Sequence, residues 1–312
     1  MYKIKQAYED FYVKELIDIN LGNGNYAYFL LKKKNLSTSE ALALISNKFN
    51  INLKNIGCAG NKDKKALTEQ YISILNGKKN LENLNLNNIK LKFIGNGNKR
   101  INLGNNLGNY FKTIVRNLDK RYDKTNFIVN YFDEQRFSKN NILIGKYILQ
   151  GNFDEICKLL EINYNDLSKN KKLLRFYLHS YQSYLFNRAV AEYLRKKVYK
   201  KVKYSLGEFI FVRKKSILKF PLISFDTHFK NKDKIYLNIL KEEKIKLEQF
   251  LIKKLPWLIE ETNYRDVFVD VKDFKTLSYE KDELNPGKFK QIIEFKLPKG
   301  SYATILVKEM FS

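Results

Sequence analysis

The chain has 312 residues, 44% of them hydrophobic and 14% aromatic, so it can fold around a sizeable core as one large domain or two smaller ones. Its formal net charge of +25 favours a polyanionic partner such as RNA, although an AT-rich genome would also raise the lysine content. No apolar run is long enough to span a membrane, and Glu9 and Asp10 stand where a signal peptide needs apolar residues, so we expect a cytoplasmic protein.

The N-terminal third of the chain has the alternating apolar pattern and glycine-rich turns that are typical of β-structure. Strands are predicted over residues 2–6, 11–17, 26–32, 56–59, 71–75, 89–94 and 110–116. One helix interrupts them, because Ser37 and Glu40 have the spacing of a capping box and an apolar-periodic segment follows as far as Phe49.

After about residue 142 the periodicity becomes mainly helical. Helices are predicted over residues 142–150, 153–160, 172–198, 238–255 and 302–311, and strands over 206–212, 265–271 and 291–297. The last two strands would complete the sheet that the N-terminal strands begin. Ser301 is expected to cap the final helix.

Asp63 lies in a glycine turn between two predicted strands, within the sequence GCAGNKDKKALTEQY. It is the only carboxylate at the tip of this turn, where Lys62, Lys64 and Lys65 surround it. Such a turn can project one reactive side chain from a rigid base, but aspartate is also common in ordinary solvated turns. The residue types alone leave both interpretations open.

The segment NYFDEQRF, residues 130–137, combines an amide, aromatic rings and a guanidinium. These groups could hold a flipped pyrimidine, with Asn130 at its hydrogen-bonding edge, an aromatic ring stacked on it and Arg136 at a phosphate. An aromatic core segment with a surface arginine is the competing interpretation. Phe11 has the same ambiguity, since an apolar residue in a strand is often simply core.

Several short motifs together resemble the TruD family of tRNA pseudouridine synthases. The matching segments are E-D-F-x-V-x-E at 9–15, Lys33 with Thr38, G-x-K-D-x-x-A-x-T-x-Q at 60–70, residues 104–109, 130–137, 175–187 and F-x-L-P-x-G-S-Y-A-T at 295–304. Asp133 departs from the pattern, because the family usually has glycine there. The resemblance runs from about residue 2 to residue 311 and is sparse between about 145 and 260.

The resemblance implies an α+β fold. A catalytic domain built on a mixed, largely antiparallel sheet is expected over residues 1–145 and 260–312, with a smaller inserted α/β TRUD domain over residues 146–259. It also implies that Asp63 is the catalytic nucleophile. The other residues expected to contact the uridine or its surroundings are Lys5, Phe11, Lys62, Asn130, Phe132, Arg136 and Tyr302.

The implied reaction is the isomerisation of uridine to pseudouridine in tRNA, for which uridine 13 is the family's typical target. The reaction is redox-neutral and hydrolyses nothing, so no cofactor and no metal are expected, and the chain has only two cysteines, two histidines and no phosphate-binding loop motif. We expect a monomer that acts away from membranes.

A non-catalytic basic RNA-binding protein with the same fold is the alternative. A metal-dependent nuclease would need clustered carboxylates, which no motif here provides.

Overall fold

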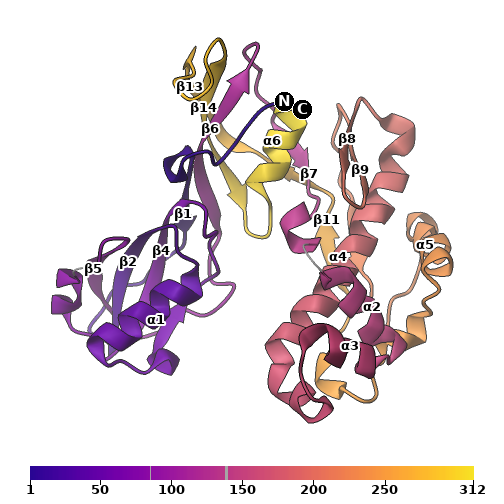
Figure 1. Ribbon diagram of the computed structural model, residues 1–312, viewed down its shortest axis with the longest axis horizontal. Coiled ribbons are helices and arrows are strands. Elements are labelled where there is room, and N and C mark those ends of the chain that lie inside the picture. The colour runs from indigo at the N-terminus through magenta and orange to yellow at the C-terminus, as the bar shows by residue number, and fades with distance from the viewer. Residues whose placement is uncertain (85, 138–139) are drawn as a thin grey trace. The chain divides into compact units, whose positions relative to one another are not determined.

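A computed structural model describes residues 1–84, 86–137 and 140–312, and these divide into two compact units (Figure 1). Unit 1 comprises Met1–Asn126, Asp270–Ala303 and Met310–Ser312, and unit 2 comprises Phe127–Val269 and Thr304–Glu309. These bounds differ from the predicted domain borders near residues 145 and 260. The domain borders of the family therefore stay a prediction.

A mixed sheet forms the frame of unit 1, with the strand order β13-β14-β6-β1-β4-β2-β5, and β3 pairs with β4. The strands are β1 Phe11–Leu16, β2 Tyr26–Lys34, β3 Ile56–Cys58, β4 Leu67–Leu75, β5 Ile89–Gly97, β6 Gly108–Leu118, β13 Lys272–Lys281 and β14 Phe289–Pro298. β1 and β4 are parallel, and the other neighbours in the sheet are antiparallel. The predicted α+β class with a largely antiparallel sheet is confirmed.

Helix α1, Thr38–Phe49, covers the face of β2, β4 and β5 (Figure 1). It begins as predicted: Ser37 Oγ accepts from the amide of Glu40, and the Glu40 carboxylate accepts from the amide of Ser37. Alternate residues of each strand meet this helix, because side chains in a strand point to opposite faces in turn. The resulting core includes Ala27, Phe29, Leu31, Ala41, Ile45, Ile72 and Ile74.

Unit 2 is mainly helical, with short two-stranded sheets. Its helices are α2 Asn141–Gln150, α3 Phe153–Leu160, α4 Lys171–Leu194 and α5 Ile235–Glu243. Its strands β8 Lys200–Tyr204 and β9 Gly207–Phe211, β10 Lys219–Leu222 and β11 Asn263–Asp266, and β7 Phe127–Val129 and β12 Phe268–Asp270 form three pairs. The long helix α4 has more buried residues than any of the other helices of this unit, and several elements pack on it.

Four local predictions are wrong. Residues 2–6 make only an isolated bridge from Lys3 to Arg116, and residues 265–271 form two short strands outside the large sheet. The helix predicted over 238–255 ends at Glu243, where Lys244 adopts a left-handed conformation. The last helix, α6 Ala303–Phe311, begins after Tyr302, and the buried Ser301 Oγ has no hydrogen-bond partner among the described residues, so it does not cap the helix.

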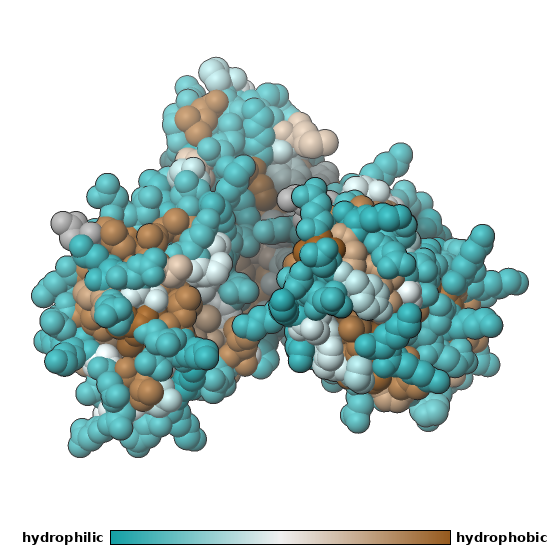
Figure 2. Space-filling model, turned by 60° about the horizontal axis from the view of Figure 1, so that its bottom comes forward, coloured by the Kyte–Doolittle hydropathy of each residue, from teal (hydrophilic) through white to brown (hydrophobic). Residues whose placement is uncertain are grey.

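Hydrophilic residues cover most of the face that Figure 2 shows, with smaller hydrophobic groups between them. This matches a chain in which 29% of the residues are charged. In the described part of the chain, none of the helices combines the length and the hydrophobicity of a membrane span.

Candidate active site

The loop that carries Asp63 joins β3 to β4 and is held from below by polar side chains at the ends of neighbouring elements. The hydroxyl of Thr38, at the start of α1, accepts from the amide of Lys62 at 2.9 Å and donates to Gln70 Oε1 at 2.8 Å. Gln70 Nε2 in turn donates to the carbonyl of Gly60 at 3.2 Å. Thr38 and Gln70 are buried, so these bonds fix the loop without competition from water.

Lys33 also anchors this loop. It follows Phe29 and Leu31 on the core-facing side of β2, so its side chain enters the protein beneath the loop and is only 1% exposed. Its ammonium donates to the carbonyl oxygens of Leu36 at 2.5 Å, Asp63 at 3.0 Å and Lys62 at 3.4 Å. Burial lowers the pKa of Lys33 to about 8, although the nearby Asp63 charge acts in the opposite direction.

Lys62 lies inside the protein. Its ammonium forms an ion pair with Glu15 on β1 at 2.5 Å, and the other oxygen of Glu15 accepts from the amide of Tyr71 at 3.0 Å. The side chain of Lys62 is 7% exposed and that of Glu15 is fully buried. The structure therefore gives Lys62 an anchoring contact, and the substrate contact expected from its sequence position stays a prediction.

The Asp63 carboxylate is one-third exposed and meets the ammonium of Lys5 at 2.7 Å. Lys5 comes from the segment before β1, and its ammonium lies 4.1 Å from the centre of the Phe11 ring. Phe11 is 3% exposed and packs edge-on against Phe111. The structure thus brings three of the sequence-predicted residues together: an exposed carboxylate, a cation beside it and an aromatic ring beneath that cation.

Asn130 and Phe132 are joined in unit 2 by an arginine that the sequence reasoning missed. Arg265 donates to the backbone oxygen of Asn130 at 3.1 Å and to its Oδ1 at 2.7 Å, while its guanidinium lies 4.1 Å from the centre of the Phe132 ring. The side-chain amide of Asn187 clamps the backbone of Phe132 by accepting at 3.0 Å and donating at 2.8 Å. This arrangement fixes both the amide and the ring.

The remaining predicted residues have simpler surroundings. Arg136 is half-buried, and its guanidinium lies 5.0 Å from the centre of the Phe176 ring. Tyr302 is half-buried just before α6. Asp133, the departure from the family pattern, accepts from Thr304 at 2.7 Å and forms an ion pair with Lys308 at 2.5 Å. Its carboxylate is therefore used to hold α6, which a glycine could not do.

The two units divide the predicted site residues between them. Unit 1 contains Lys5, Phe11, Lys62, Asp63 and Tyr302, and unit 2 contains Asn130, Phe132 and Arg136. A periodicity argument could have found Lys33, because the core-facing alternation of β2 continues directly onto it. Arg265 had no such signal, since it lies more than a hundred residues from its partners Asn130 and Phe132.

Comparison with known proteins gives one consistent result. The family model "tRNA pseudouridine synthase D (TruD)" matches residues 2–170 and 204–310. The chain belongs to the TruD family. A protein of Methanococcus maripaludis named "Probable tRNA pseudouridine synthase D 1" is 30% identical over 99% of both chains. The "tRNA pseudouridine synthase D" of Aquifex aeolicus is 31% identical over 99% of this chain and 98% of that protein.

Solved structures agree with this assignment. The crystal structure of a TruD protein from Methanosarcina mazei matches with a TM-score of 0.70 at 26% identity, covering 98% of this chain and 93% of the other. The expected family is thus confirmed, and with it the enzyme class, a TruD pseudouridine synthase that isomerises RNA uridine. In the part of the chain that the structure describes, no group of three or more His, Cys, Asp or Glu side chains could hold a metal ion.

The lowered pKa of Lys33 predicts an unusual alkaline stabilisation. Between pH 8 and pH 10 the unfolded chain keeps the Lys33 proton while the folded chain has lost it, so this residue makes the free energy of unfolding rise with pH. Relative to Lys33→Met, the wild type should gain about 2 kcal/mol over this range, because the slope stays below its limit of about 1.4 kcal/mol per pH unit near both pKa values. Urea unfolding of both proteins at several pH values measures the difference.

The matched control is Lys34→Met, which removes a lysine from the other face of the same strand, where Lys34 pairs with Glu9. If the difference in the free energy of unfolding between wild type and Lys33→Met stayed constant up to pH 10, Lys33 would not be an unfavourably buried cation.

Proposed function

We propose that this protein isomerises uridine to pseudouridine in tRNA, with Asp63 as the nucleophile and with uridine 13, the family's typical target, as its substrate. The observation that carries the proposal is the environment of Asp63. Its carboxylate is partly exposed at the tip of a loop that buried side chains fix from below, and the ammonium of Lys5 lies 2.7 Å from it. A fixed, accessible carboxylate beside a cation is suited to attack on a sugar carbon.

The reaction breaks the N1–C1′ bond of uridine and forms a C5–C1′ bond. Asp63 attacks C1′ or assists departure of the base, and the bonding electrons leave with the uracil, as in glycosidic chemistry. The uracil then turns and C5 bonds to C1′ while any bond from Asp63 to C1′ breaks and frees the carboxylate; the proton on C5 is lost while N1 gains one. Because the atoms and electrons balance within the nucleotide, the chemistry requires neither an oxidant nor hydrolysis. Lys5 would hold the Asp63 carboxylate in place and stabilise its charge.

Asn130 and Phe132 are proposed to hold the flipped base. Among the described residues, Asn130 uses one N–H on the carbonyl of Asp266 and one oxygen lone pair on Arg265. An amide has two of each, so one donor and one acceptor remain for the edge of a uracil. Arg265 also fixes the Phe132 ring, which gives the base an oriented aromatic surface. We assign Arg136 to phosphate binding and Tyr302 and Phe11 to contacts with the uridine.

The test uses unmodified tRNA that carries tritium at uridine C5, incubated with the wild-type protein and EDTA. Tritium leaves C5 only when the C5–C1′ bond forms, so its release reports the reaction directly. We expect release of one tritium per tRNA, and none from a transcript in which uridine 13 is replaced by cytidine. Tight tRNA binding without any release would favour the alternative of a non-catalytic RNA-binding protein. Release that required a divalent metal would contradict the proposed chemistry.

A further inference from the structure

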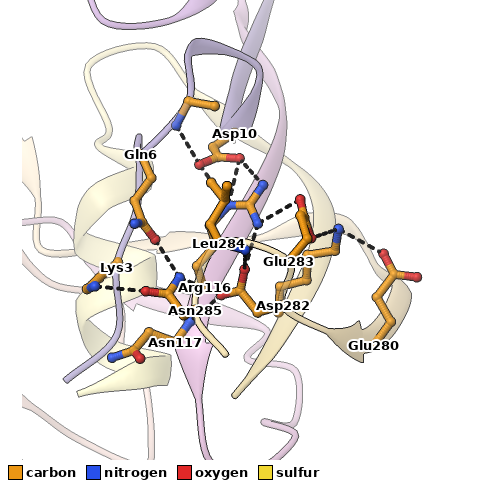
Figure 3. Close-up of polar contacts among 12 residues, drawn as sticks. Lys3, Gln6, Asp10, Arg116, Asn117, Glu280, Asp282, Glu283, Leu284 and Asn285 are labelled. Atoms are coloured by element: carbon orange, nitrogen blue, oxygen red, sulfur yellow. Dashed lines mark hydrogen bonds and ion pairs between the residues drawn. The ribbon is translucent and has the colours of Figure 1, made fainter. Parts of the chain in front are cut away.

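A buried cluster of charged and amide side chains lies beside the N-terminal segment in unit 1 (Figure 3). At its centre Arg116, on β6, donates to both carboxylate oxygens of Asp10 at 2.8 to 3.0 Å and to Asp282 Oδ1 at 2.8 Å. Arg116 and Asp282 are each 4% exposed and Asp10 is fully buried. None of these groups has a part in the proposed chemistry, so the cluster needs another explanation.

Asn285 connects this cluster to the N-terminal segment. It lies in the turn between β13 and β14, where its Nδ2 donates to Asp282 Oδ2 at 2.7 Å and to Gln6 Oε1 at 2.8 Å. Its Oδ1 accepts from the ammonium of Lys3 at 2.8 Å. The side chain of Asn285 therefore holds two residues of the N-terminal segment at once, and Figure 3 shows it between them.

Asp282 fixes Asn285 firmly in this position. Burial raises the pKa of Asp282, but hydrogen bonds from the amide of Asn117, from Asn285 and from the amide of Leu284 outweigh it, so the pKa lies below its usual value. Together with the ion pair to Arg116, these bonds hold the turn between β13 and β14 against β6.

Lys5 lies between the residues that this cluster holds. Lys3 exchanges both backbone hydrogen bonds with Arg116, at 2.9 and 2.8 Å, and the amide of Ala7 donates to Asp10 at 2.9 Å. Between these anchors Lys5 has a φ of 57°, a left-handed conformation that a residue with a Cβ rarely adopts. Such a conformation persists only where its surroundings impose it, and it is the conformation from which the Lys5 ammonium reaches Asp63.

We propose that Asn285, held by Asp282 and Arg116, is a positioning residue that keeps the Lys5 ammonium against the Asp63 carboxylate. The inference rests on the proposed function, because it assigns a catalytic consequence to the Lys5–Asp63 contact. Asn285 would affect catalysis only through Lys5, because its bonds to the N-terminal segment are to Lys3 and Gln6, on either side of Lys5. Its loss would release the side chains of Lys3 and Gln6, while the backbone bonds of Lys3 to Arg116 and the paired β-strands remain.

A double-mutant cycle tests this proposal. The rate constant of pseudouridine formation is measured in a single turnover with saturating enzyme for wild type, Asn285→Ala, Lys5→Met and the double variant. We expect Asn285→Ala to lower the rate constant about tenfold, as a small misplacement of a catalytic group does, with the tRNA Kd nearly unchanged. The double variant should be no slower than Lys5→Met, because the second substitution has nothing left to position. The proposal would be overturned if the double variant lost the product of the two single-variant rate reductions, or if Asn285→Ala changed only the tRNA Kd.

Gln291→Ala is the matched control, because Gln291 is also buried in the β13–β14 region and its side chain bonds to Tyr122 and Thr276 and, among the described residues, to none of the N-terminal segment. Gln291→Ala should lower the resistance to urea as much as Asn285→Ala does and leave the rate constant unchanged. If it lowered the rate constant as far as Asn285→Ala does, Asn285 would only stabilise the fold and would not position Lys5. A crystal structure of Asn285→Ala gives a readout that does not depend on activity. Lys5 Nζ should leave hydrogen-bond distance of Asp63, and its retention there would contradict the proposal even if the wild type made no pseudouridine.

Discussion

Replacing Asp63 by asparagine is expected to reduce pseudouridine formation by about a thousandfold or more, because an amide cannot act as the nucleophile that the proposed reaction needs. The change is nearly isosteric, and the asparagine oxygen can still accept from Lys5, which lies 2.7 Å from the native carboxylate. The loop should keep its conformation, since Lys33 and Thr38 hold it through backbone atoms. Tritium release and tRNA affinity, measured side by side, separate lost chemistry from lost binding.

The matched control for this experiment is Asp119→Asn. Asp119 also forms an ion pair with a lysine, Lys288 at 2.5 Å, but its side chain is 75% exposed and lies outside the candidate site. The Asp119→Asn substitution should leave both the rate of pseudouridine formation and the affinity for tRNA unchanged. If Asp63→Asn retained more than about a tenth of the wild-type rate, a different group would have to attack the sugar, and the assignment of Asp63 would be wrong.

The local elements that the sequence predicted correctly are those whose signal is contained in a few neighbouring residues. The capping box at Ser37 and Glu40 places the start of α1 correctly, and the alternation of Ala27, Phe29 and Leu31 marks the buried face of β2. The largely antiparallel sheet was implied by the family resemblance and not by periodicity. Strand order depends on pairing between distant segments, which no local pattern encodes.

The wrong predictions share a physical cause, which is that tertiary partners overrode a local preference. Residues 2–6 alternate like a strand, but Lys5 turns into the left-handed region where it meets Asp63. Residues 265–271 also read as a strand of the large sheet, yet they pair with β10 and β7, and β13 takes the place at the sheet edge. Both outcomes depend on which distant surface is available to each segment.

The candidate site was predictable in its residue types and not in its connections. The motif around Asp63 predicted which carboxylate acts as the nucleophile, but the cation beside it comes from 58 residues earlier in the chain. The contact between Lys3 and Asn285 spans 282 residues. Lys62 illustrates the limit most clearly: its position next to Asp63 suggested a substrate contact, whereas its ammonium lies on the buried carboxylate of Glu15. Adjacent residues in a loop can point to opposite sides of it.

The largest expected effect on stability comes from Arg116→Met. The substitution keeps much of the side-chain volume and leaves Asp10 and Asp282, both almost fully buried, without their shared cation. Removing one partner of a buried ion pair is expected to lower the free energy of unfolding by about 3 to 5 kcal/mol, because the remaining charge is uncompensated. Urea unfolding at pH 7 measures the loss, and Arg121→Met, at an exposed arginine, is the matched control.

The pH dependence of this loss identifies its origin. In the wild type the pKa of Asp282 lies below its usual value, so its contribution to stability is present above about pH 4, the pKa of an unfolded aspartate, and is lost as the pH falls through the folded pKa. In Arg116→Met the buried carboxylate of Asp282 lacks its cation and is relieved by taking up a proton. The difference between the two proteins should therefore shrink as the pH is lowered from 7 to 3. A difference that stayed constant over this range would mean that Arg116 stabilises the fold by packing alone, and that the carboxylates of Asp10 and Asp282 do not depend on its charge.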